Sequence, residues 1–183
     1  MKLFAPRLRF GCNQCGDCCR QMRVPLSHAD VLRIRRLRPD QPLASWIQVY
    51  PAEPDDLEAV WIGERLSLLT LRTRPETGCI FLNQNRCGIY AARPRPCRSW
   101  PFERGSRQLR IAPAYALMVS LSCESTPFKD HKAVEAEIDA SQREYAQFRQ
   151  LVQAWNQAVV KVPERQTLEA FVHYLTSVAE PAP

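Results

Sequence analysis

The sequence predicts an α+β fold that is mainly helical, in which short strands and cysteine-bearing loops are covered by C-terminal amphipathic helices. Apolar residues recur at helical spacing in the last third of the chain. Short strand-like runs bounded by turn residues occupy the middle, and all eight cysteines lie at or before Cys123. We expect a single domain over residues 1–183, with a cysteine-bearing part at 8–125 and a helical part at 130–180.

The first predicted element after the N-terminal cysteine loop is a helix. Ser27 and Asp30 have the three-residue spacing of a capping box, which predicts a helix that begins there and runs through Leu37. Pro39 would end it. A second short helix is expected over residues 43–50.

Two strands and a tight turn are predicted in the middle of the chain. Residues 66–72 have the composition of a strand, and residues 79–82 form a shorter strand candidate. The polar run at 83–86 predicts a turn that brings Cys87 back beside the second strand.

The backbone ahead of Cys97 is predicted to be stiff. Pro94 and Pro96 flank Arg95, and proline fixes its own φ angle and restricts the residue before it. We therefore expect an extended rather than a helical segment, which would hold Cys97 in place.

Two helices are predicted after the last cysteine. Apolar residues follow helical spacing over residues 132–160, with charged residues between them, and the pattern resumes after Pro163 in a terminal helix. The apolar positions are Val134, Ile138, Tyr145, Phe148, Leu151, Val152, Trp155 and Val159, then Leu168, Phe171, Val172, Leu175 and Val178. We expect these helices to form a packing layer, with a partner-binding face as the alternative.

The composition indicates a soluble protein. Hydrophobic residues make up 45% of the chain and charged residues 24%, which is close to the average for globular proteins. No apolar run approaches the roughly 18 to 20 residues that span a bilayer, and residues 1–10 lack the apolar core of a secretory signal. We therefore expect a cytoplasmic location without membrane contact, where reducing conditions favour metal binding over disulfides.

The cysteines begin with a compact motif. Cys12, Cys15 and Cys18 follow Cys-x-x-Cys-x-x-Cys spacing, which places three sulfurs on one loop, and Cys19 comes directly after them. Neighbouring side chains diverge from the backbone, so Cys18 and Cys19 are expected to face different surroundings. Either each serves a different metal centre, or one is a ligand and the other packs as a small apolar residue.

All eight cysteines are candidate metal ligands. The remaining four are Cys79, Cys87, Cys97 and Cys123. Eight thiolates could build two four-sulfur sites, or one site with the other cysteines structural. The spacing of the first motif is similar to four-iron ferredoxin ligation, which favours an iron-sulfur cluster, 4Fe-4S in type, over Zn²⁺. Zinc tolerates many arrangements and stays the alternative.

Basic and aromatic residues accompany the cysteines. Arg20, Arg93 and Arg98 could offset the negative charge that four thiolates leave on a metal centre, or could be surface arginines. Trp100 could shield a cluster from water, although a core position is favoured.

The cysteine pattern resembles a known family. The run from Phe10 to Arg20, the Cys87-Gly-Ile-Tyr-Ala-Ala-Arg-Pro segment and the Cys97-Arg-x-x-Pro-Phe segment are similar to the bacterial CxxCxxCC cysteine-cluster family, whose suggested role is to chelate zinc or iron. The resemblance covers about residues 10–123 and implies that the eight cysteines bind metal. Members often carry Cys-Pro-Gly at the last position, whereas Glu124 follows Cys123 here.

The family in turn resembles the cysteine-rich region of flagellin lysine N-methylases. That resemblance implies an iron-sulfur cluster and raises a cluster-dependent protein-modifying enzyme, such as a lysine N-methylase, as the alternative function. The residues themselves show no glycine-rich cofactor loop and no recognisable catalytic motif. The leading hypothesis is a metal-binding protein with a structural, redox or metal-handling role, and a protein partner or substrate stays open.

The net charge of +6 raises nucleic-acid binding as a third hypothesis. The chain lacks a recognition-helix pattern and aromatic residues interleaved with its basic ones. We therefore do not expect nucleic acid as a partner, and we interpret the arginines of the first helix as a solvated face. These are Arg33, Arg35, Arg36 and Arg38.

Overall fold

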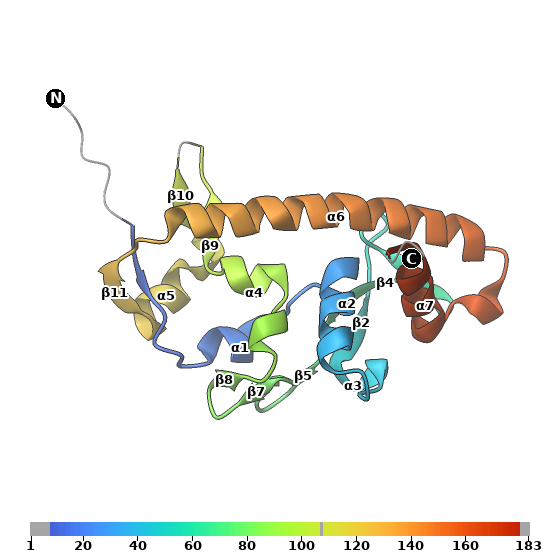
Figure 1. Ribbon diagram of the computed structural model, residues 1–183, viewed down its shortest axis with the longest axis horizontal. Coiled ribbons are helices and arrows are strands. Elements are labelled where there is room, and N and C mark those ends of the chain that lie inside the picture. The colour runs from blue at the N-terminus through green and yellow to red at the C-terminus, as the bar shows by residue number, and fades with distance from the viewer. Residues whose placement is uncertain (1–7, 107, 180–183) are drawn as a thin grey trace.

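A computed structural model describes residues 8–106 and 108–179 (Figure 1). Residues 1–7, most of the N-terminal segment in which a secretory signal was not expected, lie outside the described residues. The described chain is α+β and mainly helical, as predicted. The long helix α6 (His131–Val159) runs along the length of the molecule, and most of the shorter elements lie below it, whereas β10 lies above it (Figure 1).

The first half of the core is a helix on a small sheet. Helix α2 (His28–Leu37) starts at the predicted capping box: the Asp30 backbone donates to the Ser27 hydroxyl at 3.2 Å, and the Asp30 carboxylate accepts from the Ser27 backbone at 3.0 Å. The antiparallel sheet has the order β2-β4-β3 and consists of β2 (Ile47–Pro51), β3 (Val60–Ile62) and β4 (Arg65–Leu71). Strand β4 confirms the strand predicted at 66–72.

The helix predicted at 43–50 is wrong in its second half. Helix α3 (Leu43–Trp46) is a single turn, after which the chain enters β2. Ile47, Val49 and Tyr50 suit a pleated surface, and pairing along β4 satisfies five consecutive residues of the strand. Tertiary pairing therefore outweighs the helical spacing.

Two small hairpins carry cysteines. Strands β5 (Thr73–Arg74) and β6 (Gly78–Cys79) form the first, and β7 (Leu82–Asn83) and β8 (Arg86–Cys87) form the second. Gln84 and Asn85 have positive φ, which gives the predicted turn, and Cys87 pairs with Leu82 across it. The strand expected over 79–82 is interrupted and belongs to two hairpins.

The segment around Cys97 is helical, so the extended backbone predicted there is wrong. The 3₁₀ turn η1 (Tyr90–Ala92) precedes α4 (Arg95–Ser99), and Pro94 is its N-cap. Pro96 lies in the first turn of α4, where a helix has no use for the missing N–H. Proline therefore starts this helix instead of preventing it.

The remaining short elements lie at the end of the molecule where α6 begins (Figure 1). Helix α1 (Asp17–Gln21) contacts β6 and also α5 (Ala116–Ser122), which follows the 3₁₀ turn η2 (Pro113–Tyr115). The other elements are two antiparallel pairs, β1 (Arg9–Gly11) with β11 (Glu124–Pro127), and β9 (Phe102–Arg104) with β10 (Leu109–Ile111).

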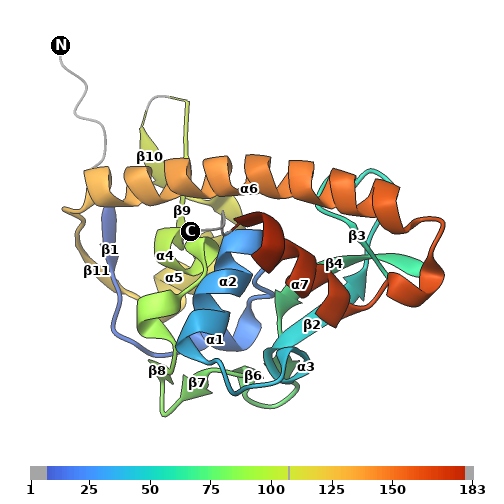
Figure 2. The ribbon, with the colours of Figure 1, turned by 45° about the vertical axis from the view of Figure 1, so that its right-hand side comes forward.

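The two predicted C-terminal helices are confirmed as α6 and α7 (Leu168–Ala179), joined through η3 (Pro163–Arg165). Helix α7 contacts α2, α3 and α6 and lies in front of α2 in Figure 2. Their buried residues join the core beside the sheet; they are Phe148, Val152, Trp155, Val159, Phe171, Val172 and Leu175. None of the helices in the described ranges is long and apolar enough to span a membrane.

Candidate metal centre

The eight cysteines are free thiols that lie in two neighbourhoods joined by α1. Four face the hydrophobic core and are called the inner group: Cys19, Cys79, Cys87 and Cys97. Three lie near the β1–β11 pair and are called the outer group: Cys12, Cys15 and Cys123. Cys18 lies between the two groups.

Each inner cysteine comes from a different element. Cys19 is on α1, Cys79 on β6, Cys87 on β8 and Cys97 on α4. Cys79 is buried with 8% of its surface exposed, and the other three are half-buried and pack against the core. Metal binding at these residues would therefore connect four separate segments of the chain.

The approach of α1 to β6 depends on a glycine. Gly78 has φ +81°, and a Cβ atom built there would lie 2.5 Å from the Cys19 carbonyl oxygen and closer still to the Arg20 Cα. Only glycine permits both this backbone conformation and this contact. Because Gly78 has no side chain, the backbone of Cys19 can lie directly against the residue next to Cys79.

The inner thiols act on one another electrostatically. Burial, together with charge on Cys19 and Cys87, raises the pKa of Cys79 to about 11. Burial also raises the pKa of Cys97, with added effects from Cys79, Cys19 and Cys87. These thiols are close enough that they cannot all ionise without a compensating cation. Clustered thiols of this kind suit a thiophilic metal.

Cys19 has the most acidic thiol of this group. The pKa of Cys19 is lowered to about 7, mainly by a hydrogen bond with the Cys18 thiol and against the opposing effect of burial. The charges of Arg93 and Arg20 contribute to this lowering. Since the thiolate is the form that binds metal, Cys19 is the inner cysteine best prepared as a ligand.

The outer group is assembled by the pairing of β1 with β11. Gly11 pairs with Glu124, which brings Cys12 beside Cys123 although 111 positions separate them in the sequence. The Asn13 side chain fixes the loop, because its amide donates to the Ser122 carbonyl at 2.9 Å and its oxygen accepts from the Cys15 backbone at 3.2 Å. Burial raises the pKa of Cys123, and charges on Cys15 and Cys12 add to this.

Cys18 is influenced by both groups. Its hydrogen bond with Cys19 raises its pKa most, followed by burial and by charges on Cys19, Cys12 and Cys97. The thiol therefore lies within electrostatic range of one outer and two inner cysteines.

The three arginines singled out from the sequence have different roles. Arg20 donates to the Cys15 carbonyl at 2.6 Å and to Asp17 at 3.1 Å, so it ties the outer loop to α1. Arg93 stacks on the Tyr90 ring with 3.9 Å from its guanidinium carbon to the ring centroid. Arg98 instead braces its own loop by donating to the Arg93 and Ala91 carbonyls.

A partly buried charge network that includes Arg95, two residues before Cys97, was not predicted from the sequence. Asp30 is completely buried, and its carboxylate accepts from the Arg95 backbone at 3.0 Å and from the Arg33 side chain. Glu144 of α6 accepts from Arg33 at 2.8 Å and from Arg95 at 2.9 Å. Glu137, seven positions earlier, also pairs with Arg95. The network fixes α2 and α4 to α6.

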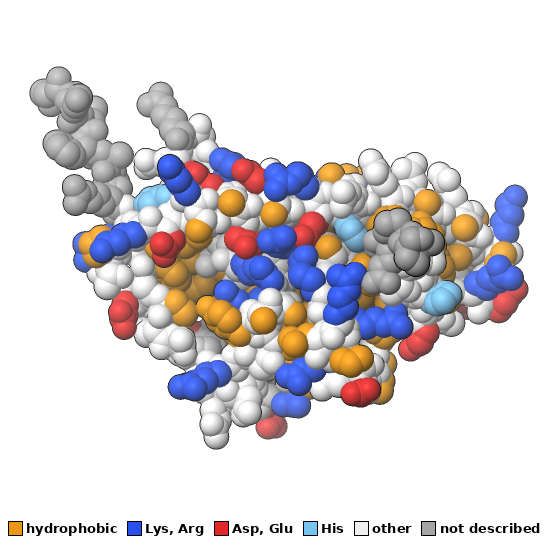
Figure 3. Space-filling view, viewed as in Figure 1, with side chains coloured by type: hydrophobic (Ala, Val, Ile, Leu, Met, Phe, Trp, Pro, Cys, Tyr) orange, Lys and Arg blue, Asp and Glu red, His pale blue; other side chains and the backbone are white. Residues whose placement is uncertain are grey.

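This network corrects one expectation. Arg33 was interpreted as part of a solvated face, but its side chain is 23% exposed and pairs with Asp30 and Glu144. Acidic and basic side chains lie next to one another below α6 in Figure 3. The seven-residue spacing of Glu137 and Glu144, which places them on one face of α6, was the signal in the sequence.

The thiols are gathered but do not surround one point at ligand distances. Among the described residues, no group of three or more His, Cys, Asp or Glu side chains is arranged so that it could hold a metal ion. The donor set nevertheless fits a thiophilic metal in number, type and burial.

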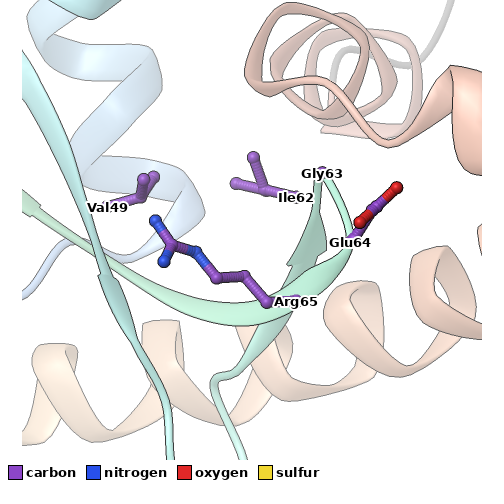
Figure 4. Close-up of a pocket in the computed structure, with 5 residues that line it drawn as sticks. All are labelled: Val49, Ile62, Gly63, Glu64 and Arg65. Atoms are coloured by element: carbon purple, nitrogen blue, oxygen red, sulfur yellow. The ribbon is translucent and has the colours of Figure 1, made fainter.

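Two shallow hollows lie apart from the cysteines. The first, of about 560 Å³, is lined by Val49 and residues 62–65 (Figure 4). The second is between β9 and α6 and also measures about 560 Å³. Its lining consists of Ser99, Phe102, Glu103, Arg104, Ile138, Ser141, Gln142, Tyr145 and Arg149. Since neither lining includes a cysteine, the candidate site is defined by the thiols themselves.

Comparison with known proteins supports metal binding in general. Searches of curated proteins and of solved structures gave no match. A family model, CxxCxxCC, described as "Putative zinc- or iron-chelating domain", matches residues 11–136. The match includes all eight cysteines and more than half of the chain. The chain therefore belongs to the CxxCxxCC zinc- or iron-chelating family.

Proposed function

We propose that this protein binds an iron-sulfur cluster, most readily of the 4Fe-4S type, through the outer group and Cys18. The observation that carries the proposal is the pairing of β1 with β11, which brings Cys123 beside Cys12. Cys12, Cys15 and Cys18 have the Cys-x-x-Cys-x-x-Cys spacing of ferredoxin ligation. Cys123 supplies the remote fourth thiolate that such ligation requires.

The residues around this site favour a negatively charged centre. Four thiolates leave an oxidised four-iron cluster with net negative charge, and Arg20 lies against the loop through its bond to the Cys15 carbonyl. Gly16, with φ +81°, lets the loop reverse direction between Cys15 and α1. When bound, the cluster would supply one-electron redox chemistry or a structural cross-link between β1, α1 and α5.

Metal and sulfide analysis of anaerobically purified full-length protein tests the proposal. We expect iron and acid-labile sulfide in comparable amounts, together with visible thiolate-to-iron absorption. C15S should lose this iron, whereas S120A on α5 should retain it, because Ser120 is exposed and its hydroxyl donates to the Leu117 carbonyl in its own helix.

Two results would count against the proposal. Zinc without iron or sulfide would overturn the iron-sulfur assignment and retain metal binding, and a folded, metal-free protein would overturn both. Spin-resonance spectra of the reduced protein distinguish a cluster from adventitious iron.

A further inference from the structure

The boundary between the two cysteine groups falls within α1. Cys18 and Cys19 are consecutive helical residues, and successive side chains on a helix point about 100° apart. The backbone of Cys19 lies against Gly78, which directs this residue to the inner group. One short helix therefore carries Cys18, which continues the outer motif, and Cys19, which belongs to the inner group.

The inner group is complete without the outer one. Its four thiols come from four elements that all pack against the hydrophobic core. The segment of Cys19 contacts both cysteine hairpins, because the Cys19 backbone lies against Gly78 and the Arg20 side chain donates to Asn85 on the hairpin that carries Cys87. Four thiols are the number that a tetrahedral thiolate site requires.

The outer group is held by different contacts. The β1–β11 pair and the Asn13 bonds fix it, and Cys12 is exposed to solvent. Charges on Cys15 and Cys12 act on Cys123. The two groups thus differ in their supporting elements and in their burial. Substitutions can therefore be made in one group without changing residues of the other.

We propose that the inner group forms a second metal centre, separate from the outer one, so that the eight cysteines serve two four-thiolate sites divided between Cys18 and Cys19. This inference rests on the proposed function of the outer group. The inner site takes a thiophilic metal, either a zinc ion or an iron-sulfur cluster.

The test is the metal content of a double variant of the outer group. Full-length wild type, C12S/C123S and the control S120A are purified anaerobically, and zinc, iron and acid-labile sulfide are measured per chain. We expect C12S/C123S to lose the outer complement of iron and sulfide and to keep the metal of the inner group. The outer double variant is decisive because its side chains lie outside the hydrophobic core and its fold can be checked by circular dichroism.

The outcomes separate the two proposals. A wild type without metal overturns the proposed function itself. If the wild type binds metal but C12S/C123S loses all of it while remaining folded, a single shared centre exists and the second centre is refuted. A C12S/C123S protein with unchanged metal content also refutes the division. Retained zinc identifies the inner centre as a single-ion site, whereas retained iron with sulfide identifies it as a cluster, and both support the division.

C87S is the complementary variant. Cys87 is at the rim of the inner group on the β7–β8 hairpin, so its replacement disturbs the core less than that of buried Cys79. We expect C87S to lose the inner metal and to retain the outer iron and sulfide. Loss of both in a folded C87S protein would contradict two separate centres.

Discussion

Replacement of Asp30 by alanine tests whether the charge network that includes Arg95 stabilises the fold. The Asp30 carboxylate is fully buried and accepts from the Ser27 backbone at 3.0 Å, from the Ser27 hydroxyl at 2.9 Å, from the Arg95 backbone at 3.0 Å and from Arg33. These bonds join the start of α2 to the start of α4. Alanine removes all of them and leaves the backbone N–H groups of Ser27 and Arg95 without this acceptor.

The expected loss of stability can be worked out from these contacts. Removal of half of a capping box costs about 1 kcal/mol, and a partly buried backbone N–H of Arg95 without a partner costs about 1 to 3 kcal/mol. Arg33 keeps its bonds to Glu144, so the full cost of a broken buried ion pair does not apply. We therefore expect D30A to lower the free energy of unfolding by about 2 to 4 kcal/mol.

Urea unfolding of the metal-loaded proteins measures this difference. D30N keeps the side-chain volume but turns a donor toward Ser27, so it should also destabilise. D139N is the control, since it removes an exposed ion pair between Asp139 of α6 and Arg104 of β9 and should leave the midpoint nearly unchanged. A D30A midpoint equal to that of D139N, with an unchanged denaturant slope, would refute the reasoning.

Three further predictions concern backbone, pH and core packing. G78A should destabilise the protein by more than about 1 kcal/mol and reduce inner-group metal, because its Cβ would meet the α1 backbone. G63A should cost less, since Gly63 also has positive φ but has open space around it. Equal effects of the two variants in thermal unfolding would contradict this prediction. Burial raises the pKa of Glu144, but hydrogen bonds from Arg33 and Arg95 outweigh it, so the folded pKa is lowered from 4.5. The stabilisation from the ionised Glu144 is therefore present above pH 4.5 and is lost as pH falls through the lower folded pKa. The difference in unfolding free energy between wild type and E144Q should shrink over that acid range. A difference independent of pH would contradict this prediction. F171A should lower stability by about 3 to 5 kcal/mol because this ring is fully buried, and a loss under 1 kcal/mol in urea unfolding would show that the α6–α7 layer is not part of the cooperative core.

Local chemistry made several elements predictable. The capping box of Ser27 and Asp30 fixed the start of α2, because both bonds form within one turn of backbone. The apolar spacing gave α6 and α7, and the polar run at 83–86 gave the turn that returns Cys87 to Leu82. These features depend on neighbours within a few residues.

The incorrect predictions involve long-range contacts. Residues 47–50 became a strand because β4 supplied a pairing partner, and Arg33 became half-buried because Glu144, distant in sequence, came to face it. Pro96 is an exception, since its place in the first helical turn is a local rule that favours α4. The expectation of a single domain with parts at 8–125 and 130–180 stays a prediction, and the methylase alternative rests on family resemblance alone.

The sequence by itself determined the chemistry of this protein: eight thiols, the spacing of the first four, and membership of a zinc- or iron-chelating family. Only the tertiary structure decided which thiols are neighbours. Cys12 meets Cys123 through the register of β1 with β11, and Cys19 approaches Cys79 because Gly78 leaves room for α1. Such contacts join segments far apart in the chain, and no local pattern encodes them. The grouping of cysteines thus follows from packing, whereas their capacity to bind metal follows from the residues themselves.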